Sequence, residues 1–175
     1  MREILFRGFT PDEDGKDKVF VNGEWIKGQW VQGSYMKLSK TTYCFKEDYE
    51  ANPDNTEHYI VFDRMTDWGL PNRHLKADVL PETIGQFVGL TDKNNKRIFE
   101  GDIVHAVYKS GYTGIPDKDF GIGVIKYGGT YYSGAAYQID IIGEPGCRIF
   151  SASLQVVIIG NIHSNPELLK GGAGK

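Results

Sequence analysis

The sequence predicts a mainly β protein with an N-terminal β subdomain, a C-terminal SH3-like β-barrel and a short C-terminal helix. Three observations favour this fold class. The chain of 175 residues contains 22 glycines, ten tyrosines and nine phenylalanines, a composition typical of short strands joined by tight turns. Apolar runs are rich in β-branched and aromatic residues and are separated by turn signals. No stretch of about a dozen residues keeps an uninterrupted helical pattern.

The N-terminal subdomain is expected over residues 1–78. Residues 2–9 read as a first strand, and 19–38 offer two strands joined at Asn22-Gly23. Asn-Gly favours a hairpin because both residues accept the positive φ of a type I′ turn. A strongly polar stretch at 41–58 then predicts a mobile insertion.

Residues 66–81 contain two prolines in a mixed sequence, which indicates a linker between two subdomains. The C-terminal subdomain is expected over 79–170. It begins with the hairpin 82–107, whose strands flank a polar turn of the residues Asp92, Lys93, Asn94 and Asn95. Asn and Asp favour such a turn because they tolerate left-handed backbone and bond to neighbouring amides.

Further strands are expected within 120–132, 136–142 and 147–162. Because a barrel removes unpaired strand edges, several short strands closed by an apolar one favour a small barrel or a strongly curved sheet. Asn165 followed by proline predicts a short helix at 165–169, with Asn165 as its N-cap. The tail 171–175 is expected to be disordered.

Four segments of the chain resemble one known family. They are GQFVGLTDKNNKRIFEGDIV at 85–104, FRGF at 6–9, EWIKGQWVQGSY at 24–35 and VIIGNIHSNPELL at 157–169. Together they are similar to the YopX family of phage and prophage proteins. The resemblance implies a mainly β protein of unassigned biochemical role, working in the bacterial cytoplasm, with no catalytic residues to carry over. Family members often have Asn-Gly where this chain has Asn94-Asn95.

Charge and composition exclude several classes of protein. The net charge is −3, with 11 basic against 14 acidic residues up to Leu80 and nine against nine afterwards. The chain therefore lacks the basic surface that the phosphates of a nucleic-acid partner would require. No apolar run approaches the roughly 20 residues of a membrane span. Cys44 and Cys147 are too few for a thiolate zinc site and are expected to be free, buried thiols.

Acidic residues in the hairpin 82–107 give only a weak indication of a catalytic or cation-binding site. Glu100 and Asp102 flank Gly101 and could form a paired acid/base site, with or without His105. The alternative, which the sequence favours, is that Gly101-Asp102 forms a bend in which Asp102 bonds to backbone amides. Asp92, Asn94 and Glu100 hint at a cation loop, but basic residues fill two positions of that template, so a structural turn is expected.

Exposed aromatic residues offer an interaction surface, for which the candidates are Trp25, Trp30, Trp68, Tyr131 and Tyr132. Core packing is the first explanation for such residues, and a protein interface the second. Stacking on nucleic acid comes last because the positive groove is missing.

We therefore expect a non-enzymatic phage or prophage accessory protein that binds a protein partner and forms a homo-oligomer. No catalytic residue, cofactor or metal ligand is indicated. Two alternatives remain open: a nucleic-acid-binding module of phage replication or gene control, and an enzyme with an acidic site near Glu100 and Asp102.

Overall fold

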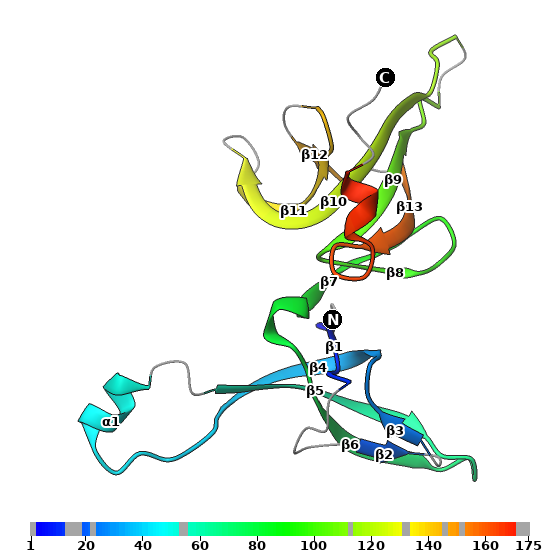
Figure 1. Ribbon diagram of the computed structural model, residues 1–175. Coiled ribbons are helices and arrows are strands. Elements are labelled where there is room, and N and C mark those ends of the chain that lie inside the picture. Colours follow the sequence, from blue (N-terminus) through cyan, green and yellow to red (C-terminus); the bar gives the residue numbers. More distant parts are fainter. Residues whose placement is uncertain are drawn as a thin grey trace. The chain divides into compact units, whose positions relative to one another are not determined.

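The computed structural model describes residues 3–12, 19–21, 24–52, 56–111, 114–130, 134–144, 147–150 and 153–170. Most of these residues lie in β-strands (Figure 1), which confirms the mainly β prediction. The chain divides into two compact units. The N-unit is Ile4–Gly85, and the C-unit is Gln86–Lys175 together with Met1–Glu3. The boundary expected after residue 78 falls inside the N-unit.

The N-unit is built on antiparallel strands in the order β6-β5-β4-β1. Its elements are β1 (Phe6–Phe9), β2 (Val19–Val21), β3 (Glu24–Ile26), β4 (Trp30–Ser39), α1 (Lys46–Ala51), β5 (Thr56–Met65), β6 (Pro71–Asp78) and the 3-10 helix η1 (Pro81–Thr83). The predicted Asn22-Gly23 turn lies outside the described residues, but Val21 pairs with Glu24 on either side of it.

The core of the N-unit gathers apolar side chains from the sheet and the segments that follow it. Its buried members are Ile26, Val31, Ile60, Ala77 and Val79. Gly33 lets β4 and β5 approach closely, because a Cβ atom there would stand 2.1 Å from the carbonyl oxygen of Val61.

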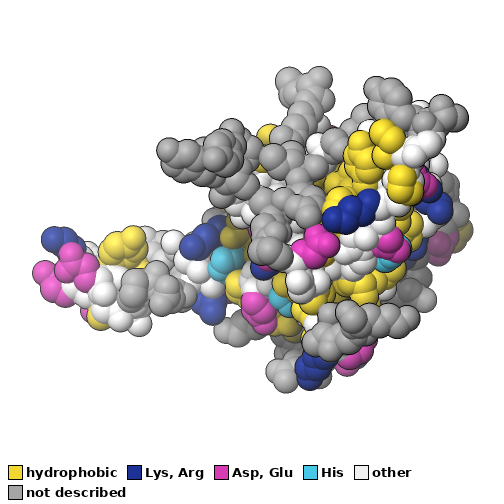
Figure 2. All heavy atoms as spheres, turned by 90° about the horizontal axis from the view of Figure 1, so that it is seen from above, with side chains coloured by type: hydrophobic (Ala, Val, Ile, Leu, Met, Phe, Trp, Pro, Cys, Tyr) yellow, Lys and Arg dark blue, Asp and Glu magenta, His cyan; other side chains and the backbone are white. Residues whose placement is uncertain are grey.

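Beyond this core, β4 and β5 continue outward and carry α1 at their far end (Figure 1). We call residues 37–52 with 56–58 the arm. The arm projects sideways in Figure 2, with acidic side chains gathered at its end. No residue of α1 is buried. The polar insertion expected at 41–58 thus includes a short helix.

The C-unit contains a hairpin and a five-stranded antiparallel sheet of order β12-β11-β10-β9-β13. Its elements are β7 (Gly85–Thr91), β8 (Arg97–Phe99), β9 (Asp102–Tyr108), β10 (Lys118–Thr130), β11 (Gly134–Ile141), β12 (Cys147–Ile149), β13 (Leu154–Asn161) and the 3-10 helix η2 (Pro166–Leu169). The sheet is strongly curved (Figure 1). Among the described residues no ladder joins its two ends, so the predicted closed SH3-like barrel is not confirmed.

One face of the curved sheet carries the core of the C-unit, made of Val88, Ile98, Val104, Ala106, Ile125, Ile139, Ile141 and Val156. Register shifts in β10 between Asp119 and Gly121, and in β13 between Ile158 and Gly160, interrupt the ladders. Such bulges add twist and bend a sheet.

The predicted helix at 165–169 is a 3-10 helix with Pro166 in its first turn. Asn165 occupies the predicted N-cap position, but its side chain makes no capping bond. Its carboxamide oxygen instead accepts the Asn161 N–H at 3.4 Å. The tail 171–175 lies outside the described residues.

Candidate functional site

The turn between β7 and β8 is a tight, internally bonded loop. The Asn95 N–H donates to the Asp92 carbonyl at 3.0 Å, and the Asp92 N–H donates to the Lys96 carbonyl at 2.8 Å. Asn95 has a φ of 61°, in the left-handed region that Asn tolerates. These bonds describe a type I turn closed by a left-handed residue, which is a common three-residue hairpin loop.

The Asp92 carboxylate fastens this turn to β13. Its Oδ1 accepts the N–H groups of Asn94 at 2.8 Å and Lys96 at 2.9 Å, and its Oδ2 accepts the Ile158 N–H at 3.1 Å. The Lys93 N–H donates to the Val156 carbonyl at 3.0 Å. The turn of the hairpin is therefore held against the outer edge of β13.

Burial and hydrogen bonding act in opposite directions on the Asp92 carboxyl. Its burial raises the pKa, but the N–H bonds from Lys96, Ile158 and Asn94 favour the charged form, and the net pKa lies below its ordinary value of 3.8. Asp92 is thus a buried carboxylate whose charge is already used by backbone amides.

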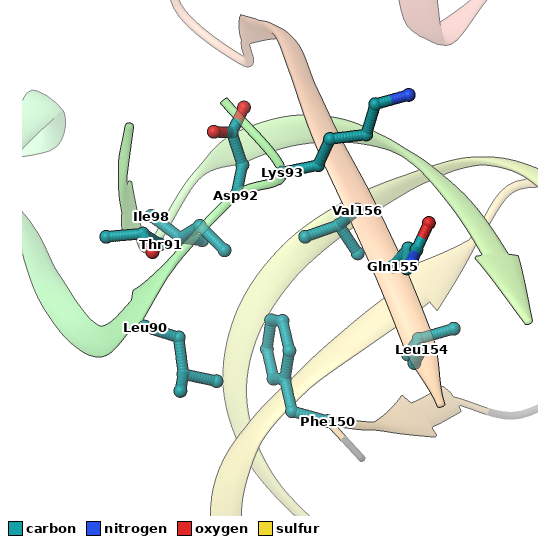
Figure 3. Close-up of a pocket in the computed structure, with 9 residues that line it drawn as sticks. All are labelled: Leu90, Thr91, Asp92, Lys93, Ile98, Phe150, Leu154, Gln155 and Val156. Carbon is teal, nitrogen blue, oxygen red and sulfur yellow. The ribbon is translucent and has the colours of Figure 1, made fainter. Parts of the chain in front are cut away.

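Between this hairpin and the segment from β12 to β13 lies a cleft of about 550 Å³, which we call the hairpin cleft. Figure 3 shows Leu90 and Phe150 facing one another, with Val156 on the side of Phe150 away from Leu90 and Lys93 extending away from the Phe150 ring. The residues that line it are Leu90, Thr91, Asp92, Lys93, Ile98, Phe150, Leu154, Gln155 and Val156. Five of the nine lining side chains are apolar, and Lys93 supplies a charge that no described side chain pairs.

Glu100 and Asp102 are held by different partners. Asp102 is buried and accepts the Phe99 N–H at 2.8 Å, next to Gly101 with a φ of 81°. Glu100 accepts the Tyr127 N–H at 3.4 Å. Both carboxylates bond to backbone amides, and Gly101-Asp102 forms a bend between β8 and β9.

The His105 ring and the Asp119 carboxylate form a contact that the sequence did not indicate. The His105 Nε2 lies 3.0 Å from the Asp119 Oδ1, at the bulge in β10, and both side chains are largely exposed. His105 pairs across the sheet with Ile122 and Val157, and neither of these residues is a nucleophile. His105 and Asp119 are separated by a loop, and no pattern in the sequence indicated that they would meet.

The five aromatic residues proposed as an interaction surface have separate surroundings. Trp25 packs on Phe20 with ring centroids 4.9 Å apart and is half exposed, whereas Trp30 packs edge-on against Phe9 at 5.5 Å. Trp68, in the turn between β5 and β6, is 87% exposed. Tyr131 and Tyr132 lie outside the described residues.

Comparison with known proteins identifies the family. The family model described as YopX protein matches residues 24–170. The chain belongs to the YopX family. A solved structure described as protein EF1440 from Enterococcus faecalis is 19% identical to this YopX chain and has a TM-score of 0.42. The match covers 97% of this chain and 99% of the chain in that structure. No curated protein matches the chain.

The hairpin cleft lies within the matched region of this YopX chain, which includes both the β7–β8 turn and β13. The side chains that most often bind metal ions are dispersed. Within the described ranges, no three His, Cys, Asp or Glu side chains gather as a metal ion would require. The same ranges hold no helix with the length and apolar character to cross a membrane.

Cys44 is a free thiol, but it is exposed, so the prediction that it would be buried is wrong. It lies on the arm, where no core covers it. The side chain of Cys147 lies outside the described residues.

Proposed function

We propose that this YopX-family protein is a non-enzymatic phage or prophage accessory protein that binds a protein partner through the hairpin cleft. The partner's contact segment is an extended peptide with an apolar anchor flanked by carboxylates. The phage setting and the bacterial cytoplasm follow from the family resemblance. The observation that carries the proposal is the apolar cleft of about 550 Å³ with a lysine at its edge.

The size and lining of the cleft suit side chains rather than a large metabolite. Apolar walls from Leu90, Phe150 and Val156 match an apolar anchor, since pockets of this size bind mainly through apolar contact with a few polar groups. Much of the lining comes from β7 and β13, and side chains held on strands form a surface along which an extended peptide can lie.

The charges at the cleft favour an acidic neighbour of that anchor. The Asp92 carboxylate is charged, but it is buried and its two oxygens accept three backbone N–H groups. Lys93 lines the cleft and is exposed. An incoming carboxylate would therefore meet the exposed Lys93 ammonium rather than the buried Asp92 carboxylate, which favours its association and selects against basic peptides.

The surroundings of the acidic residues support a non-enzymatic role. Glu100 and Asp102 are bonded to separate backbone amides, and His105 is paired with Asp119. A general acid/base pair needs its members directed at one reacting group. The nucleic-acid alternative is weakened further because Arg97, one of three basic residues near the hairpin tip, lies 3.3 Å from the Glu3 carboxylate.

The strand order supports an SH3-like arrangement as the finer description of the C-unit. Strands β9 to β12 follow one another as a meander, and β13 pairs back onto β9. With the curvature of β10 and β11, this order matches a five-stranded barrel that is only partly closed. An experimental structure with a flat five-stranded sheet would contradict this arrangement.

The binding proposal can be tested by NMR titration of the full chain with acetyl-Glu-Leu-Phe-Glu-amide and with its lysine analogue, acetyl-Lys-Leu-Phe-Lys-amide. The acidic peptide should shift the amide signals of Leu90, Ile98 and Val156, and the lysine peptide should bind more weakly. Lys93→Glu should reverse this preference.

Leu90→Asp tests the apolar wall, because Leu90 is 45% exposed and the change leaves the core intact. It should abolish the shifts caused by the acidic peptide. Leu70→Asp is the matched control, since Leu70 is an exposed leucine of the N-unit. Equal binding of both peptides, or no shift at the cleft at millimolar peptide, would refute the proposal.

A further inference from the structure

The arm has features that its own chain does not explain. Its helix α1 has six residues and buries none of them. Helices this short are marginal without tertiary packing. The strands that carry it form a two-stranded ribbon, because β6 pairs with β5 only from Tyr59 onward and β1 pairs with β4 only up to Gly33. Isolated two-stranded ribbons are also marginal.

Aromatic side chains are exposed at the end of the arm. Phe45 is 67% exposed and Tyr49 is 60% exposed, and Tyr43 meets Tyr49 edge-on with ring centroids 6.0 Å apart. They border an open concavity of about 450 Å³. Large exposed aromatic groups clustered on a projecting element mark a protein interface.

Charge is separated along the arm in a way that identifies the occupant. The stem carries Lys37 and Lys40, both exposed and neither with an ion-pair partner among the described residues, and one carboxylate, Glu57, which accepts the Tyr59 hydroxyl at 2.6 Å. Helix α1 carries three carboxylates and one lysine, Lys46, which lies 3.3 Å from Glu50. This leaves the carboxylates of Glu47 and Asp48 without a partner in the same part of the chain.

Along the sequence the order is therefore basic stem, aromatic residues, acidic helix. We propose that the arm is the self-association element of this protein, and that its occupant is the arm of a second copy packed antiparallel to it. In that arrangement each acidic helix faces the partner's basic stem, and the aromatic residues of both copies meet in the middle. A two-fold axis forms each contact twice, as an isologous interface requires.

The edge of β4 supports the same occupant. From Ser34 to Ser39 this strand pairs with β5 on one side, and no described strand pairs with its other side. Unpaired edges are surfaces on which another chain can pack. The arm can thus bury its edge and its aromatic side chains against an identical arm.

Sedimentation velocity of the full chain over a range of concentrations tests the proposal. The wild type should form a dimer of 19.6 kDa chains. Phe45→Ser should raise its dissociation constant by about 100-fold, as expected for an aromatic residue at the centre of an interface. Trp68→Ser is the matched control, because it removes a more exposed aromatic side chain from a turn outside the arm and should leave the dimer unchanged.

Charge reversal provides the decisive comparison. Two variants, Glu47→Lys/Asp48→Lys and Lys37→Glu/Lys40→Glu, should each weaken the dimer by about tenfold or more, because like charges then face each other twice. Mixed in equal amounts, the two variants should form a heterodimer as tight as the wild type. Circular dichroism would show that each variant stays folded.

Three outcomes would overturn the proposal: a wild type that stays monomeric, a dimer that Phe45→Ser leaves intact, or charge-reversed variants that do not recover on mixing. A monomer that binds some other protein through the arm would assign the arm to that partner. Peptide binding is measured in the full chain by the NMR signals of the hairpin cleft, which lies in the C-unit, whereas the arm belongs to the N-unit. Either proposal can therefore fail without the other.

Discussion

Replacing Asp92 by Asn should unfasten the hairpin from β13. The asparagine oxygen can still accept the N–H groups of Asn94 and Lys96, but its amide would meet the Ile158 N–H donor to donor. A hydrogen bond to a charged group contributes about 1.5–3 kcal/mol, and an orphaned buried donor costs about 1–3 kcal/mol. Allowing for the weaker neutral acceptor at the turn, we expect a loss of about 3 kcal/mol, or roughly 100-fold in the local opening equilibrium.

The cost should depend on pH with a definite sign. The folded-state pKa of Asp92 lies below its ordinary value of 3.8. The stability that the carboxylate contributes is therefore complete above the unfolded-state pKa and is lost as the pH falls through the folded-state pKa. Asparagine does not titrate, so the difference between wild type and Asp92→Asn should be constant near neutral pH and should shrink below 3.8.

Amide hydrogen exchange at Ile158 and Lys96 is the appropriate assay. It reports opening at the contact itself, whereas tryptophan fluorescence would report only on the N-unit, which holds Trp25, Trp30 and Trp68. If the opening free energy at the Ile158 amide falls by less than about 0.5 kcal/mol, the carboxylate does not fasten the turn. A difference that persists unchanged at low pH would show that its charge is irrelevant.

Two further substitutions test the backbone of each unit by urea denaturation. Gly33→Ala should cost about 3 kcal/mol or more, because its Cβ would lie 2.1 Å from the Val61 carbonyl oxygen and two paired strands would have to separate; a cost under about 1 kcal/mol would contradict this. Asn95→Ala should cost about 1 kcal/mol because alanine is strained at a φ of 61°, whereas Asn95→Gly should be neutral or slightly stabilising. Equal stability of these two variants would show that the left-handed conformation does not matter.

Local chemistry made the turn of the hairpin 82–107 predictable. Asp and Asn side chains bond to amides two to four residues away, and Asn accepts positive φ, so the sequence alone indicated a turn at Asp92–Asn95. The same local reasoning indicated a short helix with Asn165 at its N-cap, but the side chain does not form a capping bond. The carboxamide bonds instead to the Asn161 N–H, a turn earlier in the chain. A single local pattern could not show which backbone N–H group the Asn165 carboxamide oxygen would accept.

Contacts between distant segments were not predictable from the sequence. The Asp92–Ile158 bond joins residues 66 positions apart, and the hairpin cleft lies where this bond and the Lys93–Val156 bond hold β13 against the turn. Leu90 and Phe150 looked like ordinary strand residues until the fold placed them on facing walls. The extent of the barrel was uncertain for the same reason, since strand patterns do not show which edges pair.

The arm shows a different limit of sequence reasoning. Its stretch was expected to be a mobile insertion because it is polar, yet its helix formers and aromatic residues have an order that becomes meaningful only when a second copy is considered. If the arms pair, each dimer presents two hairpin clefts. A partner with two suitable segments then binds the second as an intramolecular event, with apparent affinity raised by as much as about 10²–10⁴-fold when both can be engaged together. Weak single-site binding at a shallow cleft would in that case be sufficient for a stable complex, and self-association would determine the strength of partner binding without any change at the cleft.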